Sequence, residues 1–163
     1  MGVADTAAAD AERYMQIALQ MAERGMAAGG PPVGACLVRN DELIAAAHNA
    51  VIAELDITAH AEIAVIRQAC QELKSLNLDG CVLYVTVEPC PMCLAASHYA
   101  GINEIIFGAS IDEFNVVTGS ELCLHADELL SGHSDLQVHG GVLANKCNAL
   151  IDNWRPFTGS VKN

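Results

Sequence analysis

Residues 81–93 read CVLYVTVEPCPMC, and this short stretch indicates how the chain folds. Its first half, Cys81 to Val87, is a run of apolar and β-branched residues bounded by Asp79-Gly80 and Pro89, which predicts a strand buried in a sheet. Its second half introduces a helix that we expect to run from Pro91 to about Ala100. The stretch therefore predicts a strand, a short loop and a helix in succession.

The rest of the chain alternates between strand and helix patterns around this stretch. Apolar residues recur at helical spacing in residues 11–28, and again in a helix that Thr58 is suited to cap. The polar dipeptide Asn40-Asp41 between two apolar runs predicts a hairpin. The expected elements are helices at 11–28, 58–73, 91–100 and 142–154, and strands at 33–39, 43–47, 81–87, 102–108 and 136–139. Their order predicts an α/β fold, a three-layer α/β/α sandwich.

Length and composition indicate one domain. The 163 residues, 52% of them hydrophobic, suffice for one sizeable core. We expect a domain at residues 11–157, a frayed N-terminus at 1–10 and a tail at 158–163. The apolar runs are too short to cross a bilayer, and no basic region precedes an apolar segment. Seven cysteines, an odd number, favour reduced thiols over a disulfide framework, so we expect a cytoplasmic protein with no membrane partner.

Four residues in two clusters offer the chemistry. One residue separates His60 from Glu62, and Cys90 and Cys93 stand one helical turn apart. Two thiolates and a neutral imidazole balance the charge of Zn²⁺ and leave one tetrahedral position open, as a catalytic zinc needs. Zinc at such a site lowers the pKa of a water ligand from 15.7 towards roughly 7. We therefore expect one zinc per chain, held by His60, Cys90 and Cys93, with Glu62 as the catalytic residue that moves protons.

Two other kinds of site are considered for the cysteine pair. A structural zinc needs a fourth soft ligand, and the nearest candidates, Cys81 and His98, have no paired spacing. A redox pair leaves His60 and Glu62 without a role. A non-catalytic zinc-binding or redox module is therefore the alternative from a different functional class.

The two clusters together match the signature of zinc deaminases, in which a His-x-Glu unit is combined with Pro-Cys-x-x-Cys. The chain resembles the cytidine deaminase-like superfamily over roughly residues 12–110, specifically the branch of nucleobase and tRNA adenosine deaminases. The residues that carry the resemblance are Pro32-Val33-Gly34-Ala35, Asn49, Thr58-Ala59-His60-Ala61-Glu62, Pro89-Cys90-Pro91-Met92-Cys93 and Phe107-Gly108-Ala109. It implies a mixed five-stranded sheet between helices and a homodimer whose interface borders the active sites. It also implies substrate contacts from Asn49, from the main chain at Ala61 and from the carbonyl of Glu88.

The charge of the chain bears on its substrate. Twenty acidic residues against 8 basic ones give a net charge of −12, without a basic cluster to neutralise several phosphates. Members of the branch that edit tRNA usually carry several basic residues on the final helix, whereas residues 148–157 hold only Arg155. Nucleic acid is thus a disfavoured partner. We expect hydrolytic deamination of a free base, cytosine or guanine, with release of ammonia. Deamination of the wobble adenosine of tRNA is the alternative.

Aromatic side chains towards the C-terminus are expected to cover the bound base, because stacking holds a planar ring well. Phe114, Trp154 and Phe157 are the candidates, and packing in the core or at a dimer interface explains them equally well. Acidic groups such as Asp112 or Asp152 would accept a hydrogen bond from an N–H of guanine or cytosine. No spacing rule selects one of them.

Overall fold

A computed structural model describes residues 3–132 and 134–154. Its centre is a sheet of five strands in the order β2-β1-β3-β4-β5. The strands are β1 (Gly34–Arg39), β2 (Glu42–His48), β3 (Cys81–Val87), β4 (Glu104–Ala109) and β5 (Gln137–His139). β1 pairs antiparallel with both β2 and β3, whereas β3, β4 and β5 run parallel. The predicted mixed five-stranded sheet is confirmed.

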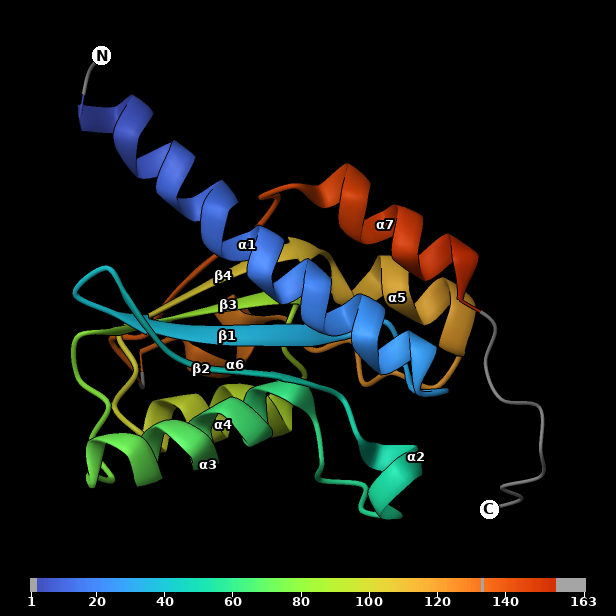
Figure 1. Ribbon diagram of the computed structural model, residues 1–163, viewed down its shortest axis with the longest axis horizontal. Coiled ribbons are helices and arrows are strands. Elements are labelled where there is room, and N and C mark those ends of the chain that lie inside the picture. The colour runs from blue at the N-terminus through green and yellow to red at the C-terminus, as the bar shows by residue number, and fades with distance from the viewer. Residues whose placement is uncertain (1–2, 133, 155–163) are drawn as a thin grey trace.

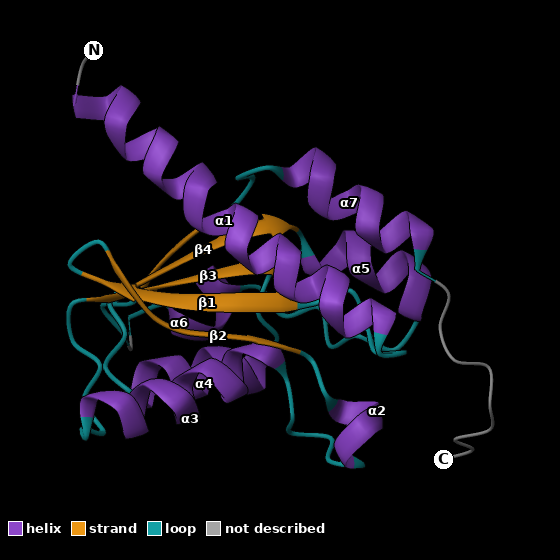
Figure 2. Cartoon of the chain, in the orientation of Figure 1, coloured by secondary structure: helices purple, strands orange, loops and turns teal. Residues whose placement is uncertain are grey.

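Helices cover both faces of this sheet (Figure 1; Figure 2). One face carries α1 (Val3–Ala27) and α7 (Ala144–Asn153), with α5 (Ile111–Thr118) packed against α7. The other face carries α3 (Ala61–Leu73) and α4 (Pro91–Tyr99), and α6 (Ala126–Leu130) lies against α4. A short helix, α2 (Val51–Glu54), follows β2. The three-layer α/β/α sandwich is therefore confirmed.

The two central strands bring helices from both layers close to the sheet. β1 and β3 are almost entirely buried, as expected for strands covered on both faces. Gly34 allows α1 to lie directly on β1, because a side-chain carbon at this position would collide with the backbone of Ala18 and Ala22. Asn40 and Asp41 both have positive φ, in keeping with the two-residue turn predicted between β1 and β2. The packing fixes β3, and with it the loop that leads to Cys90.

Several element boundaries differ from those predicted. α1 begins at Val3 rather than near residue 11, so the expected N-terminal segment 1–10 is helical from Val3 onward. α3 begins after His60 rather than Thr58, because Thr58 bonds to the carboxylate of Asp56 instead of capping the helix. The short helices α2, α5 and α6 were not predicted, since so few residues leave little periodic signal. The predicted tail 158–163 lies outside the described residues.

None of the helices in residues 3–132 and 134–154 combines the length and the apolar character that a membrane span requires.

Candidate metal centre and substrate cavity

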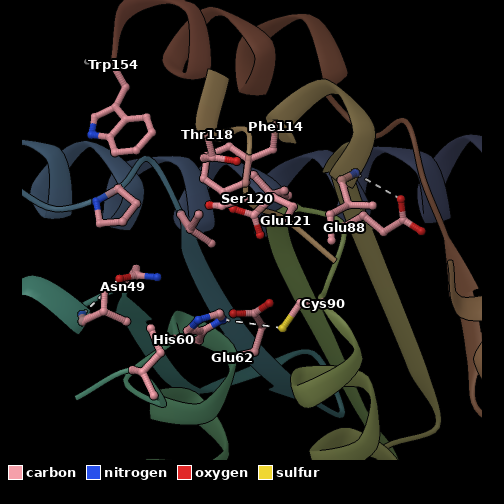
Figure 3. Close-up of a pocket in the computed structure, with 16 residues that line it drawn as sticks. Asn49, His60, Glu62, Glu88, Cys90, Phe114, Thr118, Ser120, Glu121 and Trp154 are labelled. Atoms are coloured by element: carbon pink, nitrogen blue, oxygen red, sulfur yellow. Dashed lines mark hydrogen bonds between the residues drawn. The ribbon is translucent and has the colours of Figure 1, made fainter. Parts of the chain in front are cut away.

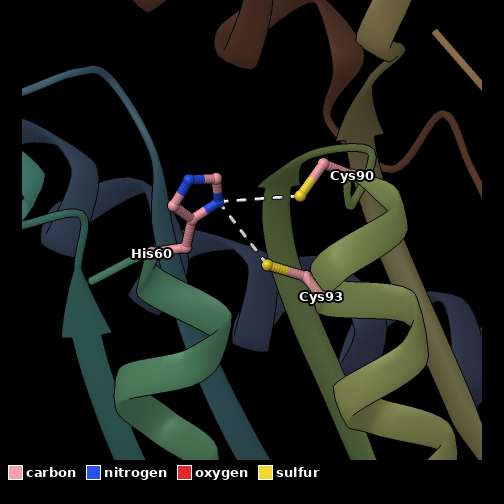
Figure 4. A group of neighbouring side chains, drawn as sticks. All are labelled: His60, Cys90 and Cys93. Atoms are coloured by element: carbon pink, nitrogen blue, oxygen red, sulfur yellow. Dashed lines mark hydrogen bonds between the residues drawn. The ribbon is translucent and has the colours of Figure 1, made fainter. Parts of the chain in front are cut away.

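The three side chains predicted to bind zinc meet where two helices begin. His60 is the N-cap of α3, Cys90 is the N-cap of α4, and Cys93 lies in the first turn of α4. His60 Nδ1 lies 3.7 Å from Cys90 Sγ and 3.5 Å from Cys93 Sγ (Figure 4). Tetrahedral zinc, with bonds of about 2.0 Å to nitrogen and 2.3 Å to sulfur, separates such ligand atoms by about 3.5 Å. The spacing therefore fits a zinc ion.

The charges of these three groups also suit a cation. A hydrogen bond from Cys93, supported by one from His60, lowers the pKa of Cys90 to about 4. The same Cys90–Cys93 contact, together with burial, raises the pKa of Cys93. A second thiolate is thus unfavourable beside the first until a positive charge compensates both. A coordinated metal ion supplies that charge and deprotonates a thiol ligand outright.

Glu62 projects into the same site from the first turn of α3 (Figure 3). The residue is only 3% exposed, and burial raises the pKa of its carboxyl group. Its Oε2 atom is buried without a hydrogen-bond partner among the described residues. Leaving such an oxygen unsatisfied costs free energy, which a polar ligand beside the metal position would recover. The carboxyl group is therefore placed to exchange protons there.

A cavity of about 290 Å³ opens above the metal position. His60, Glu62 and Cys90 line one side of it, and Phe114 faces them from the other (Figure 3). The rings of Phe114 and Trp154 lie 5.9 Å apart at 31°. This volume is at the lower end of the range of small-ligand sites, about 300–1,000 Å³. The cavity therefore suits a single planar base between polar and aromatic walls.

Comparison with known proteins now identifies the family. The family model of the cytidine and deoxycytidylate deaminase zinc-binding region matches residues 8–109. The chain belongs to this deaminase family. The expected superfamily is thus confirmed, and the deaminase is a hydrolase of C–N bonds with zinc as its cofactor, one ion at His60, Cys90 and Cys93. Membership, with Glu62 beside the metal position, favours a catalytic zinc over a structural or redox module.

Two kinds of relative share this family. The tRNA-specific adenosine deaminase of Bacillus subtilis is 38% identical over 140 residues, which cover 86% of the chain and 85% of that protein. A guanine deaminase of Bacillus subtilis is 41% identical over 99 residues, or 60% of the chain and 64% of that protein. A solved structure from studies of A-to-I editing by tRNA:A34 deaminases is 33% identical, with a TM-score of 0.69 over 85% of the chain and 98% of that structure.

The structure brings some of the predicted substrate-binding residues of this deaminase to the cavity. Asn49, Glu88, Phe114 and Trp154 all line it. Asn49 is 6% exposed, and its Oδ1 accepts a hydrogen bond from the Val51 amide at 3.1 Å, so it also shapes the turn into α2.

Other predicted residues are not among those that line the cavity. Ala61 is fully buried and is not among the lining residues. Of the acidic candidates, Asp112 pairs with His125, and neither Asp112 nor Asp152 lines the cavity. Phe157 lies outside the described residues.

Sequence reasoning missed the wall that faces the metal centre. Thr118, Ser120 and Glu121 line the cavity from α5 and the segment after it (Figure 3). Their spacing matches no motif, and a turn between two short helices leaves no periodic pattern. Glu121 next to Gly119-Ser120 offered a weak signal, because binding residues lie on loops more often than on the elements that the loops connect.

Proposed function

We propose that this deaminase hydrolyses the exocyclic amine of a purine, and that the wobble adenosine of tRNA is its first candidate substrate. The observation that carries the proposal is the extent of the match to the tRNA-specific adenosine deaminase of Bacillus subtilis, which spans 86% of the chain at 38% identity. The match to the guanine deaminase of Bacillus subtilis, at 41% identity, stops at 60% of the chain. These relatives favour tRNA adenosine, the alternative in the sequence analysis, over free cytosine or guanine.

The residues of the chain divide the reaction between them. Zinc, when bound, supplies a water ligand of lowered pKa and acts as a Lewis acid. The buried Glu62 would take one proton from the attacking water and deliver it to the ring nitrogen. It would then take the second proton, from the hydroxyl now bonded to the ring carbon, and deliver that one to the departing ammonia. Its raised pKa suits this exchange, because a group that both accepts and donates works best near the operating pH.

The walls of the cavity would hold the base over the metal. Phe114 and Trp154 offer aromatic surface on which a purine stacks after it leaves an RNA loop. The amide Nδ2 of Asn49 would donate to a ring acceptor, since its Oδ1 already accepts from Val51. The carbonyl of Glu88 and the main chain at Ala61 stay proposals for the remaining polar contacts.

Replacing Asn49 tests whether its amide donates to substrate. The Asn49→Asp variant keeps an acceptor for the Val51 amide but loses the donor, so kcat/KM should fall by about 10- to 100-fold, or roughly 1–3 kcal/mol. Asn49→Ala should lose at least as much activity, and both proteins should keep their zinc in metal analysis. If Asn49→Asp works like the wild type while Asn49→Ala fails, Asn49 serves the turn alone.

Free guanine is the second candidate, favoured by the charge around the cavity. Among the described lining residues none is lysine or arginine, whereas Glu121 contributes a carboxylate. A carboxylate accepts hydrogen bonds from the ring N–H and the adjacent amino group of guanine, and adenine lacks this pair of donors. The net charge of −12 also weakens attraction to an RNA backbone.

One assay separates the two candidates. The zinc-loaded protein is incubated with a tRNA that has adenosine at the wobble position, and with guanine, cytosine and adenosine in parallel. Inosine in the tRNA, with little ammonia from free guanine, supports the first candidate. Release of ammonia from guanine, without inosine in the tRNA, supports the second candidate instead. Turnover of cytosine alone, or of none of these, would overturn the assignment of a purine substrate.

We also propose a homodimer formed through α4 and α6. A cavity between these helices is lined mostly by apolar groups, including Ala95, Leu129 and Leu130, and by Tyr99, which is 86% exposed. α4 carries the cysteine ligands, so a second copy seated here would border the active site. Sedimentation should give twice the chain mass of 17.2 kDa, and Tyr99→Glu should shift the protein towards monomer. A wild-type protein that stays monomeric at high concentration would contradict this.

A further inference from the structure

His125 stands between two carboxylates outside the metal centre. Its Nδ1 lies 3.0 Å from Glu88 Oε1, and its Nε2 lies 3.1 Å from Asp112 Oδ2. The second oxygen of Glu88 accepts a hydrogen bond from the Ile111 amide at 3.1 Å (Figure 3). Both ring nitrogens therefore face acceptors, and only the protonated imidazole donates to both. Nothing in the sequence marks His125, because it belongs to no motif.

The bridge joins three separate parts of the fold. Glu88 comes two residues before the zinc ligand Cys90, Asp112 belongs to the first turn of α5, and His125 is the N-cap of α6. Glu88 is 6% exposed, and a buried carboxylate is costly unless a positive partner compensates it. The hydrogen bond to Glu88 raises the pKa of His125, so the imidazolium is favoured as that partner.

The segment held by this bridge forms the outer wall of the cavity. Thr118, Ser120 and Glu121 of this wall face the metal side, and Thr118 Oγ1 is buried without a hydrogen-bond partner among the described residues. At its start the wall is fixed by the end of α5 and by the hydrogen bond from the Glu121 amide to Asn115 Oδ1. At its far end the contacts of His125 with Glu88 and Asp112 fasten it to the metal-ligand loop.

We propose that His125 is a positioning residue: its protonated ring fastens the outer wall, residues 118–121, to the loop that carries the zinc ligands, and so sets the grip of the cavity on the substrate. The inference rests on the proposed function only for its kinetic effects. The fastening of the wall itself is a property of the protein without substrate.

Hydrogen exchange of the zinc-loaded protein tests, without a substrate, whether His125 fastens the wall. In His125→Gln, which lacks the charge, amides in 119–125 should exchange about tenfold faster or more than in the wild type. His125→Arg keeps a cation with several donors and should recover much of the protection. His139→Gln is the matched control, because His139 pairs with Glu104 at 3.7 Å on an exposed part of the sheet. Equal exchange in His125→Gln and wild type would overturn the proposal, as would failure of His125→Arg to recover protection.

The pH dependence gives a second readout. The titratable groups that interact with His125 are Glu88 from the β3–α4 loop and Asp112 from α5. Cys123, two residues before His125, interacts with the same two carboxylates and with Glu121. Since the pKa of His125 is raised on folding, the contribution of the bridge is complete below the ordinary histidine value of about 6.5 and is lost as pH rises through the folded value. Protection of the wall in wild type should fall over that range, and in His125→Gln it should stay flat. A wild-type profile without this change would contradict the bridge.

Kinetics with whichever substrate the assay identifies complete the test. KM should rise about tenfold in His125→Gln while kcat stays within about threefold, because the wall binds substrate but takes no part in proton transfer. Zinc content should stay at one per chain. A loss confined to kcat would contradict a role in substrate grip. If no substrate is found, the proposed function fails while the exchange result still decides the bridge.

Discussion

Glu62→Gln is expected to retain its zinc and to lose activity by about 10²- to 10⁴-fold in kcat, the range for a positioned group that transfers protons. The carboxyl group lies beside the metal position without belonging to the ligand set. Glutamine has nearly the same shape and still fills the buried space, but it cannot carry a proton from water to the base. Ammonia release under single-turnover conditions measures the loss, and metal analysis verifies the zinc content.

The control for this substitution is Glu72→Gln, which changes the same residue type near the other end of α3, where the side chain is exposed. Its activity should equal that of the wild type. Thermal unfolding should show Glu62→Gln to be at least as stable as the wild type, because the change removes a carboxylate whose pKa is raised by burial. Activity within about tenfold of wild type would mean that another group transfers the protons.

Most of the strands and the longer helices could be predicted because burial imposes a periodic pattern of apolar residues on the sequence. β3 occupies the predicted residues Cys81–Val87, since a strand covered on both faces must be apolar throughout. The predicted ends of helices were less accurate. Thr58 is a residue type that often caps helices, but its hydroxyl bonds to Asp56 instead, and residue type alone does not reveal this competition. α5 has a capping box at Ser110 and Glu113 that would have located its start.

The site divides in the same way. The predicted metal ligands and Glu62 stand at fixed spacings where two helices begin, so the sequence alone named the side chains that the structure brings together there. The opposite wall is built from tertiary contacts, and nothing in the local sequence relates Glu88 to its partners, His125 at the start of α6 and the Ile111 amide at the start of α5. The substrate is not marked by such a spacing: net charge favours a free base, whereas the 38% identity to the tRNA-specific adenosine deaminase of Bacillus subtilis over 86% of the chain favours tRNA adenosine.

Cys93→Ala is expected to lose zinc and, with it, both activity and stability. Cys93 is fully buried at the first turn of α4, where its thiolate completes the three-ligand set. Metal bound only to the folded state stabilises it by about 4 kcal/mol when its free concentration is a thousand times Kd. In a chain of this size, each kcal/mol lost lowers the midpoint of thermal unfolding by about 2–4 °C, so loss of the metal should lower it by about 10 °C.

Cys147→Ala separates the ligand role of Cys93 from the loss of a buried thiol, because Cys147 is 1% exposed in α7 and lies outside the ligand set. This variant should keep one zinc per chain and lose only the stability that the contacts of the Cys147 side chain provide. A chelator should then lower the unfolding midpoints of wild type and Cys147→Ala by the same amount, and leave that of Cys93→Ala unchanged. Because the metal is the only difference that chelation makes, a midpoint of Cys93→Ala that still falls, or full zinc in that variant, would show that Cys93 is not a ligand.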